Sequence, residues 1–501
     1  MQHTPPSFSY DFCKTHGILL NTSEQGKLEI LCLHSVNYQS LNEIKRLCTG
    51  QSVKFKAIDA DEFEQLIQNK FANQNRSSSE VLDRLEEDIM SFSDVASALE
   101  EPEDLLNSED DAPIIRLLNS IFFEAIRENA SDVHIEPYEK IMHIRFRLDG
   151  VLKDTLTTKS QVAPLLVSRI KVLAKLDIAE KRVPQDGRLS LKLGGKAIDL
   201  RVSTIPAAYG ERVVLRLLNK ETSLMDLTNL GMPTELLEQF IKIINLPHGI
   251  ILVTGPTGSG KTTTLYSALK KMDSSRLNIM TVEDPIEYYF DNISQTQVNT
   301  KAGMTFAKGL RAILRQDPDV VLIGEIRDPE TANISIQASL TGHLVLSTLH
   351  TNTAIGAITR LKDIGVEPFL LSSTVVAVLA QRLVRRLCAS CKVAYHPDEF
   401  ELATLGLDEP TPLHQTKLHQ TELYQAKGCN QCYNSGYKGR IAIYELINID
   451  GHCKKLINEN ASETEIEQYL RTQSLSLAQS GFALVKDGKT SFAEVVRITQ
   501  I

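Results

Sequence analysis

The sequence predicts a multidomain α/β protein whose largest part is a parallel β-sheet with a phosphate-binding loop. Three observations lead to this fold class. The segment "GPTGSGKTTT" matches the pattern G-x-x-x-x-G-K-[ST]. From about residue 236, short apolar segments alternate with helical ones, as in parallel sheets covered by helices. Two C-x-x-C pairs interrupt this alternation near its end. The 501 residues suffice for about three or four domains.

The first 111 residues divide into a small module and an acidic connection. Residues 1–72 mix short apolar runs with helical segments such as "DADEFEQLIQNKF", which indicates a small α+β domain. Residues 73–111 are polar, and residues 80–111 hold 13 acidic side chains and one arginine, in a chain of net charge −9. Because this stretch has little apolar material for a core, we interpret it as a linker.

Residues 112–235 are predicted to form a second α+β domain. It opens with the helical segment "APIIRLLNSIFFEAIRENA". In "MHIRFRLDG", apolar residues alternate with His143, Arg145 and Arg147, which is typical of a strand with one buried face. Two glycines between "RLSLKL" and "KAIDLRVS" indicate a hairpin turn. A further strand is expected at "GERVVLRLLN", and a helix at "APLLVSRIKVLAKLD".

Residues 236–501 are predicted to form the parallel sheet. "GIILVTG" leads into the glycine-rich motif and "TTTLYSALKKM" leaves it, so the motif has the preceding strand and following helix that a phosphate loop needs. "NIMTVEDP", "DVVLIGEI" and "HLVLSTLH" are further apolar strands. Asp328 as N-cap, Pro329 in the first turn and Gly342 at the end delimit a helix between the last two.

The glycine-rich motif predicts where a nucleoside triphosphate binds. Glycines let backbone N–H groups point at the phosphates, and the N-terminus of the following helix adds partial positive charge. Lys261 is expected to reach the β- and γ-phosphates, and Thr262 to hold Mg²⁺ through its hydroxyl. The predicted nucleotide-binding residues, called the phosphate loop below, are Gly255, Pro256, Thr257, Gly258, Ser259, Gly260, Lys261 and Thr262.

Hydrolysis needs more than binding, because a water must be oriented and the transferring phosphoryl group neutralised. Charged side chains at the ends of predicted strands supply candidates, since ligands of parallel sheets bind at strand termini. These candidates are Glu283 and Asp284 after one strand, Glu325, Arg327 and Asp328 after another, and His343 and His350 at the two ends of a third.

Arginines in two further places could neutralise phosphate charge. Arg311 and Arg315 are four residues apart, on one face of a predicted helix. Arg201 and Arg216 lie on predicted strands of the preceding domain. Each is equally compatible with a surface salt bridge. The functional alternative is an arginine finger, supplied across a domain or subunit boundary.

The paired cysteines predict a structural zinc site. Cys388 and Cys391 form "CASC", Cys429 and Cys432 form "CNQC", and 37 residues separate the pairs. Four thiolates suit tetrahedral Zn²⁺, and the long gap indicates an inserted hairpin module, which we place at residues 386–440. Redox pairs are the less favoured alternative, because disulfides are rare in cytosolic proteins.

Composition limits where the protein acts. The N-terminus lacks the charged and apolar regions of a signal peptide, and the apolar stretch "FLLSSTVVAVLA" is too short to span a membrane. A cytosolic protein with only indirect membrane contact is therefore expected. The overall acidity argues against a sequence-independent nucleic-acid binder, which needs basic surface against phosphates.

Residues 112–501 resemble the secretion ATPase superfamily, which drives type II secretion and type IV pili. "GPTGSGKT" looks like its Walker A motif, "TVEDPIE" its Asp box, "LIGEIRD" its Walker B region and "TGHLVLSTLHTN" its His box. The cysteine quartet looks like its metal-binding insertion. "SDVHIEPYE", "VSRIKVLAKLDIAEKRVPQDGR" and "RVSTIPAAYGERVVLRLL" are most similar to the E-component ATPase of the general (type II) secretory pathway.

The resemblance implies a homohexamer of RecA-like domains, each preceded by a PAS-like domain, that hydrolyses ATP at subunit boundaries. It also implies that the N-terminal module docks onto an inner-membrane partner, the L component. The arginines that match the family's phosphate site are Arg201, Arg216, Arg311, Arg315 and Arg327. The Walker B acid is Glu325 rather than an aspartate, which leaves Glu283 and Glu325 as alternatives for the general base, and we favour Glu325.

We therefore expect a cytoplasmic ATPase motor that is attached to the bacterial inner membrane through a partner and drives pseudopilus assembly and protein export, without nucleic acid. A type IV pilus assembly ATPase shares every motif, although the short N-terminal region favours secretion. A DNA-uptake or conjugation motor would be supported by basic loops with interleaved aromatics, which the sequence lacks. A nucleotide-gated scaffold without turnover is a third alternative.

Overall fold

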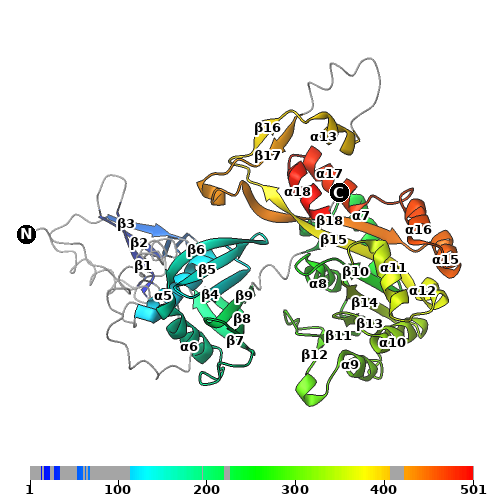
Figure 1. Cartoon of the computed structure of the whole chain (residues 1–501), viewed down its shortest axis with the longest axis horizontal. Coiled ribbons are helices and arrows are strands. Elements are labelled where there is room, and N and C mark those ends of the chain that lie inside the picture. Colours follow the sequence, from blue (N-terminus) through cyan, green and yellow to red (C-terminus); the bar gives the residue numbers. More distant parts are fainter. Residues whose placement is uncertain are drawn as a thin grey trace, which may run out of the picture. The chain divides into compact units, whose positions relative to one another are not determined.

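A computed structural model of the chain divides into two compact units, Met1–Asn219 and Lys220–Ile501, each of which is described by itself (Figure 1). The described residues are parts of 13–67, followed by 113–193, 196–218, 226–406 and 422–499. The predicted linker at 73–111 lies outside them.

The second unit begins before the boundary that the sequence predicted at residue 236. The short η4 (Leu227–Leu230) and α7 (Thr234–Ile244) belong to it, because Leu227 and Phe240 are buried in its core. The burial of these two apolar side chains, rather than the start of the strand–helix alternation, therefore sets the domain limit.

The N-terminal part of the first unit contains a three-stranded sheet. Its strands are β1 (Ile18–Thr22), β2 (Leu28–Leu33) and β3 (Lys54–Ile58). β2 pairs antiparallel with β1 and parallel with β3. Leu19, Leu31 and Phe63 are buried between these elements, as expected for a small α+β module.

The rest of the first unit is a six-stranded antiparallel sheet in the order β6-β5-β4-β9-β8-β7. Its elements are α5 (Pro113–Arg127), β4 (Asp132–Pro137), β5 (Ile141–Leu148), β6 (Val151–Lys159), η2 (Ser160–Val162), α6 (Ala163–Leu173), β7 (Gln185–Leu193), β8 (Lys196–Ala207) and β9 (Gly210–Leu218). The apolar residues of β5 pack with α5 and α6, whereas Arg145 and Arg147 point to the polar face, as the alternating pattern predicts.

The second unit is built on a seven-stranded sheet in the order β12-β11-β13-β14-β10-β15-β18. The strands are β10 (Gly249–Thr254), β11 (Ile279–Glu283), β12 (Ser294–Gln297), β13 (Val320–Ile323), β14 (Leu344–Leu349), β15 (Val375–Leu387) and β18 (Tyr437–Asn448). All neighbours are parallel except β15 and β18. The predicted parallel sheet is therefore present, with one antiparallel edge strand.

Helices cover both faces of this sheet. Because side chains alternate along a strand, Ile250 and Leu252 of β10 enter one core and Ile251 and Val253 the other. α7 and α8 (Lys261–Lys271) cover the second face. The first face is covered by α9 (Phe306–Ile313), α10 (Pro329–Leu340), α11 (Ala354–Asp363), α12 (Pro368–Thr374), α15 (Gly451–Asn458), α16 (Glu463–Leu470), α17 (Leu477–Lys486) and α18 (Phe492–Thr499).

A small module interrupts the chain between β15 and β18. It contains the antiparallel pair β16 (Val393–Tyr395) and β17 (Leu423–Gln425), the short α13 (Glu399–Thr404) and η6 (Asn430–Cys432). This agrees with an inserted module between the cysteine pairs. Of the helices in the described part, none is both long and apolar enough to cross a bilayer.

Candidate nucleotide and metal sites

The carboxyl edge of the seven-stranded sheet brings most of the predicted site together. Parallel strands end at the same edge, so the phosphate loop after β10 shares it with Glu283 of β11, Glu325 after β13 and His350 after β14. One strand, β14, separates β10 from β13, and two separate β10 from β11. At about 4.8 Å per strand, Glu325 is therefore on a closer strand than Glu283.

The phosphate loop has the backbone of an anion cradle. Gly255, Gly258 and Gly260 have φ angles of +147°, +80° and +88°, which side chains with a Cβ rarely adopt. α8 begins at Lys261, within the last two residues of the loop, so the free N–H groups of its first turn face the same space. Thr262 is exposed on the first turn of α8, where its hydroxyl can reach a magnesium ion.

Lys261 is the cation of the loop. Its Nζ donates to the carbonyl oxygens of Gly255 at 2.7 Å and Pro256 at 3.1 Å, and its side chain is buried. Burial lowers the pKa of Lys261 to about 8, although the negative charge of Glu325 opposes this change. The ammonium group is therefore held at the mouth of the cradle, close enough to Glu325 to interact with it.

Glu325 lies among cationic and ionisable groups. Its carboxylate forms an ion pair with Arg327 and lies 3.4 Å from His350 Nε2. Burial lowers the pKa of His350 and the charge of Lys261 adds to this effect, whereas the charge of Glu325 opposes it. Thr348 Oγ1 donates to the Gly324 carbonyl at 2.7 Å and fixes the turn that carries Glu325. This carboxylate can accept a proton from a water beside the phosphate loop.

Glu283 is also buried, but hydroxyl and amide groups occupy its carboxylate. One oxygen accepts a short hydrogen bond from the Tyr266 hydroxyl. The other accepts from Thr281 Oγ1 at 2.6 Å and from Gln295 Nε2 at 3.1 Å. Burial and the charge of Glu283 raise the pKa of Tyr266, which keeps that hydroxyl a donor. Both oxygens are thus committed to holding β11, β12 and α8 together.

The structure separates the two predicted histidines. His350 follows the carboxyl end of β14, and its segment is tied to the loop because Thr254 Oγ1 and Thr351 Oγ1 are hydrogen-bonded at 2.6 Å. His343 precedes β14, at the opposite edge of the sheet, and its Nδ1 lies 2.8 Å from the Ala338 carbonyl. The structure therefore does not bring His343 to Glu325.

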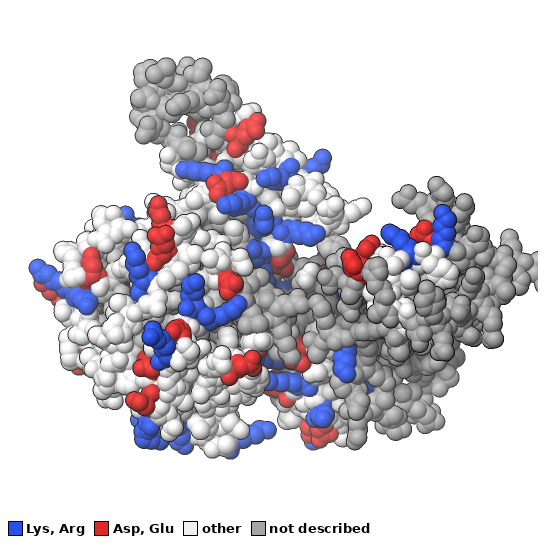
Figure 2. Space-filling model, turned by 180° about the vertical axis from the view of Figure 1, so that it is seen from behind, with Lys and Arg blue, Asp and Glu red and all other residues white. Residues whose placement is uncertain are grey.

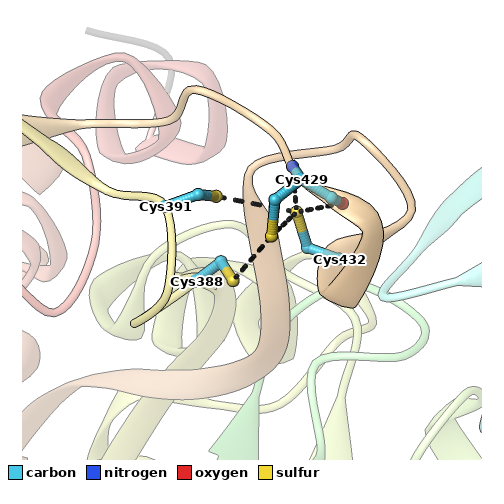
Figure 3. A group of neighbouring side chains, drawn as sticks. All are labelled: Cys388, Cys391, Cys429 and Cys432. Carbon is cyan, nitrogen blue, oxygen red and sulfur yellow. Dashed lines mark hydrogen bonds between the residues drawn. The ribbon is translucent and has the colours of Figure 1, made fainter.

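The four paired cysteines form one compact cluster (Figure 3). Their sulfur atoms lie within 4.8 Å of one another, with 3.9 Å between Cys388 and Cys429 and 3.7 Å between Cys391 and Cys432. A tetrahedral zinc with Zn–S bonds of about 2.3 Å requires sulfur separations of about 3.8 Å. The four positions therefore fit a Cys₄ zinc ion.

Backbone N–H groups favour the thiolate form of Cys432, whereas burial raises the pKa of Cys391. The N–H groups of Cys429 and Gly436 each lie 3.2 Å from Cys432 Sγ. Burial raises the pKa of Cys432, but these N–H donors and the adjacent thiols outweigh it and bring the pKa to about 6. Gly428 and Gly436, both with positive φ, form the tight turns around the second pair. The donor set has no open position, which is typical of a structural metal.

Comparisons with known proteins define the family. A sequence model of "Type II/IV secretion system protein" matches residues 107–497, and a model of an N-terminal domain of "GSPII protein E" matches residues 7–71. Type II secretion system protein E of Pseudomonas aeruginosa is 51% identical over 99% of this chain and 97% of its own length. Type II secretion system ATPase E of Vibrio cholerae is 49% identical over 98% and 96%.

This chain belongs to the E-protein family of type II secretion systems.

Solved structures agree with the predicted fold class. The pilus retraction motor PilT with bound ADP has a TM-score of 0.52 at 27% identity, over 75% of this chain and 95% of that one. The ATPase DotB of Legionella pneumophila has a TM-score of 0.58 at 20% identity, over 80% and 98%, and shows the fold alone. The RecA-like α/β core and the membership of the secretion ATPases are thereby confirmed.

The three arginines of the second unit that the resemblance predicts for a phosphate site have different surroundings. Arg327 pairs with Glu325 at the carboxyl edge. Arg311 of α9 forms a 2.6 Å ion pair with Glu330 of α10, and Arg315 donates to the Arg311 carbonyl at 2.9 Å. The latter two side chains form exposed surface contacts in this structure. Asp328 caps α10 as predicted, through the Thr331 N–H at 2.8 Å.

Arg201 and Arg216 of the first unit are paired across β8 and β9. Arg216 Nε donates to Asp132 Oδ1 at 2.9 Å, although just over half of the Arg216 side chain remains exposed. Asp132 has two other partners, Ser131 Oγ at 2.8 Å and Arg147 Nε at 3.5 Å. Arg216 could therefore exchange Asp132 for a phosphate without leaving this buried carboxylate unpaired.

Sequence reasoning missed three residues that shape the site of this E protein. Tyr266 and Gln295 hold Glu283, and Gln381 contacts the phosphate loop from β15. Tyr266 looks like a core aromatic on α8, and Gln381 is a lone polar residue within an apolar strand. The only available signal was that an isolated glutamine between "VAVLA" and "RLV" needs a hydrogen-bond partner if it is buried.

Proposed function

We propose that this chain is the ATPase motor that drives pseudopilus assembly and protein export in a type II secretion system. The observation that carries the proposal is that about half of the residues are identical over nearly the full length of proteins named as its E component, with the N-terminal region included. A motor that shared only the nucleotide-binding unit would not match in residues 7–71.

The chemistry follows from the carboxyl edge of the sheet. The phosphate loop holds the triphosphate of ATP, Lys261 contacts the β- and γ-phosphates, and Thr262 binds Mg²⁺. Glu325 acts as the general base for the attacking water. Two observations support this choice: Glu325 follows β13, which is nearer to β10 in the sheet than β11 is, and both oxygens of Glu283 are engaged by other side chains. Zn²⁺ in the cysteine cluster holds the inserted module together.

The site is completed by assembly. We infer a homohexamer in which Arg201 and Arg216 supply positive charge to a nucleotide at a domain or subunit boundary. The exposure of Arg216 and the spare partners of Asp132 support this role. Arg311 and Arg315 are proposed to act in the same way: on assembly, they would leave their present partners, Glu330 and the Arg311 carbonyl, and contact the nucleotide phosphates. An arginine finger is worth roughly 10³–10⁵ in rate in other phosphoryl-transfer enzymes.

The place of action follows from the family. Residues 1–72 are proposed to dock on the inner-membrane L component, which keeps the protein at the cytoplasmic side of the bacterial inner membrane. Nucleic acid is not proposed as a partner. On the face in view in Figure 2, basic and acidic side chains of the described residues are interspersed, without the continuous basic stripe that phosphate-backbone binding uses.

The alternatives remain weaker than export. A type IV pilus assembly ATPase shares the motifs, but the full-length relatives carry the type II name. A DNA-uptake or conjugation motor would be supported by basic loops with interleaved aromatics, which the sequence lacks. A scaffold without turnover would leave the cationic surroundings of Glu325 unused.

The first test measures ATP hydrolysis as a function of assembly. Phosphate release per chain should rise by at least about tenfold from the dilute monomer to the hexamer, because the proposed arginine finger is supplied across a subunit boundary. Arg216→Ala should reduce that rise without changing the unfolding temperature by more than a few degrees. Activity per chain that is the same in the monomer and the hexamer would contradict the shared site.

The second test concerns the metal. Anaerobically purified protein should contain about one zinc per chain, and Cys391→Ser should release it, because a tetrahedral site loses most of its affinity with one thiolate. The matched control is Cys453→Ser, a buried cysteine outside the cluster, which should keep its zinc. Less than half an equivalent in wild type would count against the site.

A further inference from the structure

β15 carries a buried glutamine that lies outside the motifs described above. Gln381 is 2% exposed and follows Ala380, which is paired with Thr254 at the end of β10. Because β10 and β15 are parallel neighbours, this glutamine lies beside the point where β10 enters the phosphate loop. A buried amide at this position needs hydrogen-bond partners, and Thr264 of α8 supplies one of them.

Gln381 contacts the phosphate loop at both of its ends. A Cβ on Gly255 would clash with the Gln381 carbonyl oxygen. A Cβ on Gly260 would lie 2.8 Å from Gln381 Nε2. These approaches are possible only because both loop residues are glycines. The carbonyl and the side-chain amide of Gln381 therefore pack directly against Gly255 and Gly260, the first and last glycines of the phosphate loop.

The same side chain reaches the helix that follows the loop. Thr264 Oγ1 donates to Gln381 Oε1 at 2.7 Å, and the threonine is fully buried. Thr264 N–H donates in turn to the Gly260 carbonyl at 3.0 Å, within the first turn of α8. Gln381 thus fixes both the loop and the helix N-terminus whose N–H groups face the phosphates.

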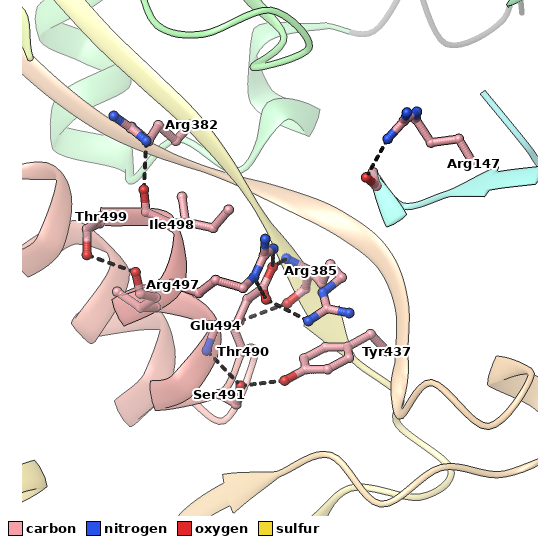
Figure 4. A network of polar contacts seen from close by, with 12 residues as sticks. Arg147, Arg382, Arg385, Tyr437, Thr490, Ser491, Glu494, Arg497, Ile498 and Thr499 are labelled. Carbon is pink, nitrogen blue, oxygen red and sulfur yellow. Dashed lines mark hydrogen bonds and ion pairs between the residues drawn. The ribbon is translucent and has the colours of Figure 1, made fainter. Parts of the chain in front are cut away.

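Neighbouring residues anchor the strand that carries Gln381 on the side of α18 (Figure 4). Arg382 Nη1 donates to the Ile498 carbonyl at 2.7 Å. Arg385 Nη2 donates to the buried Glu494 carboxylate at 2.8 Å. Helix α18 therefore fixes β15 through contacts that do not involve the phosphate loop. Gln381 is thus held in place by β15 and can determine where the loop lies.

We propose that Gln381 is a positioning residue of the phosphate site, which sets the spacing of Gly255 and Gly260 and the direction of the first turn of α8. It does so without touching the nucleotide. Without its amide, the Thr264 hydroxyl loses its bond to β15 and keeps only its interaction with the Tyr444 hydroxyl of β18. The loop also loses the packing beneath Gly255 and Gly260, so the N–H groups no longer converge on the phosphates. The inference rests on the proposed use of this loop for ATP.

The test compares the affinity of the full-length protein for Mg·ADP among variants. Gln381→Met keeps the volume of the side chain but removes both hydrogen-bonding groups, and Thr264→Val removes the donor. Each should raise the Kd at least about tenfold, and the double variant should be no worse than the poorer single one, since the two groups act as a pair. Thr264→Ser keeps the hydroxyl and should restore affinity to within about threefold of wild type.

A purely structural role would give a different result. Ser372→Ala serves as the matched control, because Ser372 is buried in the same unit and donates to Asn458 at 2.7 Å, away from the loop. It should lower the unfolding temperature and leave the Kd unchanged. If folded Gln381→Met and Thr264→Val bind Mg·ADP within about twofold of wild type, the inference is wrong. If wild type binds neither ADP nor ATP, the proposed function fails and this inference with it.

Discussion

Glu283 and Glu325 each follow an apolar strand of the same sheet and are buried at 3% and 9% exposure, yet their carboxylates have different neighbours. Glu283 accepts hydrogen bonds from a tyrosine, a threonine and a glutamine, all of them neutral. Glu325 lies against Arg327 and His350, and its charge acts on Lys261. Position at the end of a strand and burial therefore do not by themselves decide the role of a carboxylate. Its hydrogen-bond and ion-pair partners must also be known.

The difference separates a structural acid from a chemical one. A carboxylate whose oxygens are both used by fixed donors cannot accept a proton from water without losing those bonds. A carboxylate whose partners are exposed side chains can accept a proton more readily, because those partners have room to change position. Arg327 is two-thirds exposed, so it can move when a nucleotide enters, whereas the partners of Glu283 are in strands and a helix.

The largest expected effect comes from neutralising each acid in turn. Glu325→Gln should keep ATP binding and lower hydrolysis by roughly 10²–10⁴, the usual contribution of a general base. Glu283→Gln places an amide N–H₂ against hydroxyl donors and should cost about 1–3 kcal/mol of stability, with a smaller loss of hydrolysis per folded chain. Phosphate release and thermal unfolding of both variants, measured side by side, check this.

The opposite pattern would reverse the comparison. If Glu325→Gln turns over normally and Glu283→Gln does not, the base is Glu283, and the hydrogen bonds around it must open during catalysis.

A smaller effect concerns the cation that distinguishes the surroundings of Glu325. Lys261 has a pKa of about 8 without nucleotide, and the negative charge of bound phosphates raises it. As pH rises from about 7.5 to about 9, the free protein loses the lysine charge, so the affinity for Mg·ADP should fall about tenfold and binding should take up a proton. Calorimetry in buffers of different ionisation enthalpy measures both quantities.

Lys261→Arg provides the control for this pH dependence. The guanidinium stays charged across the range, so any residual affinity of this variant should not change with pH. A wild-type affinity that is equally flat would show that the ammonium keeps its charge and that its burial matters less than the geometry implies.

The features that could be predicted from the sequence are those that depend on a few adjacent residues. The strand before the phosphate loop, the helix after it and the capped helix at Asp328 each follow from a few adjacent residues, and the structure contains all of them. The cysteine cluster was predictable because two short spacings and the donor type suffice. The sequence also favoured Glu325, but only through family resemblance.

What could not be predicted depends on contacts between distant segments. Thr264 and Gln381 are 117 residues apart, and Arg216 and Asp132 are 84 apart. The hydroxyl of Tyr266 meets Glu283 only because α8 packs beside β11. His343 and His350 were predicted at the two ends of one strand, and the structure places them at opposite edges of the sheet, so that only His350 lies beside Glu325.

The central claim is that ATP hydrolysis at Glu325 drives export, and replacing the gene in the bacterium of origin tests it most directly. Cells that express only Glu325→Gln should retain type II exoproteins in the periplasm, while pilus-dependent motility continues. Cells with Tyr266→Phe, which removes a donor from Glu283 instead, should still export. Normal export by Glu325→Gln at a wild-type level of expression, or loss of pilus motility with export intact, would contradict the account.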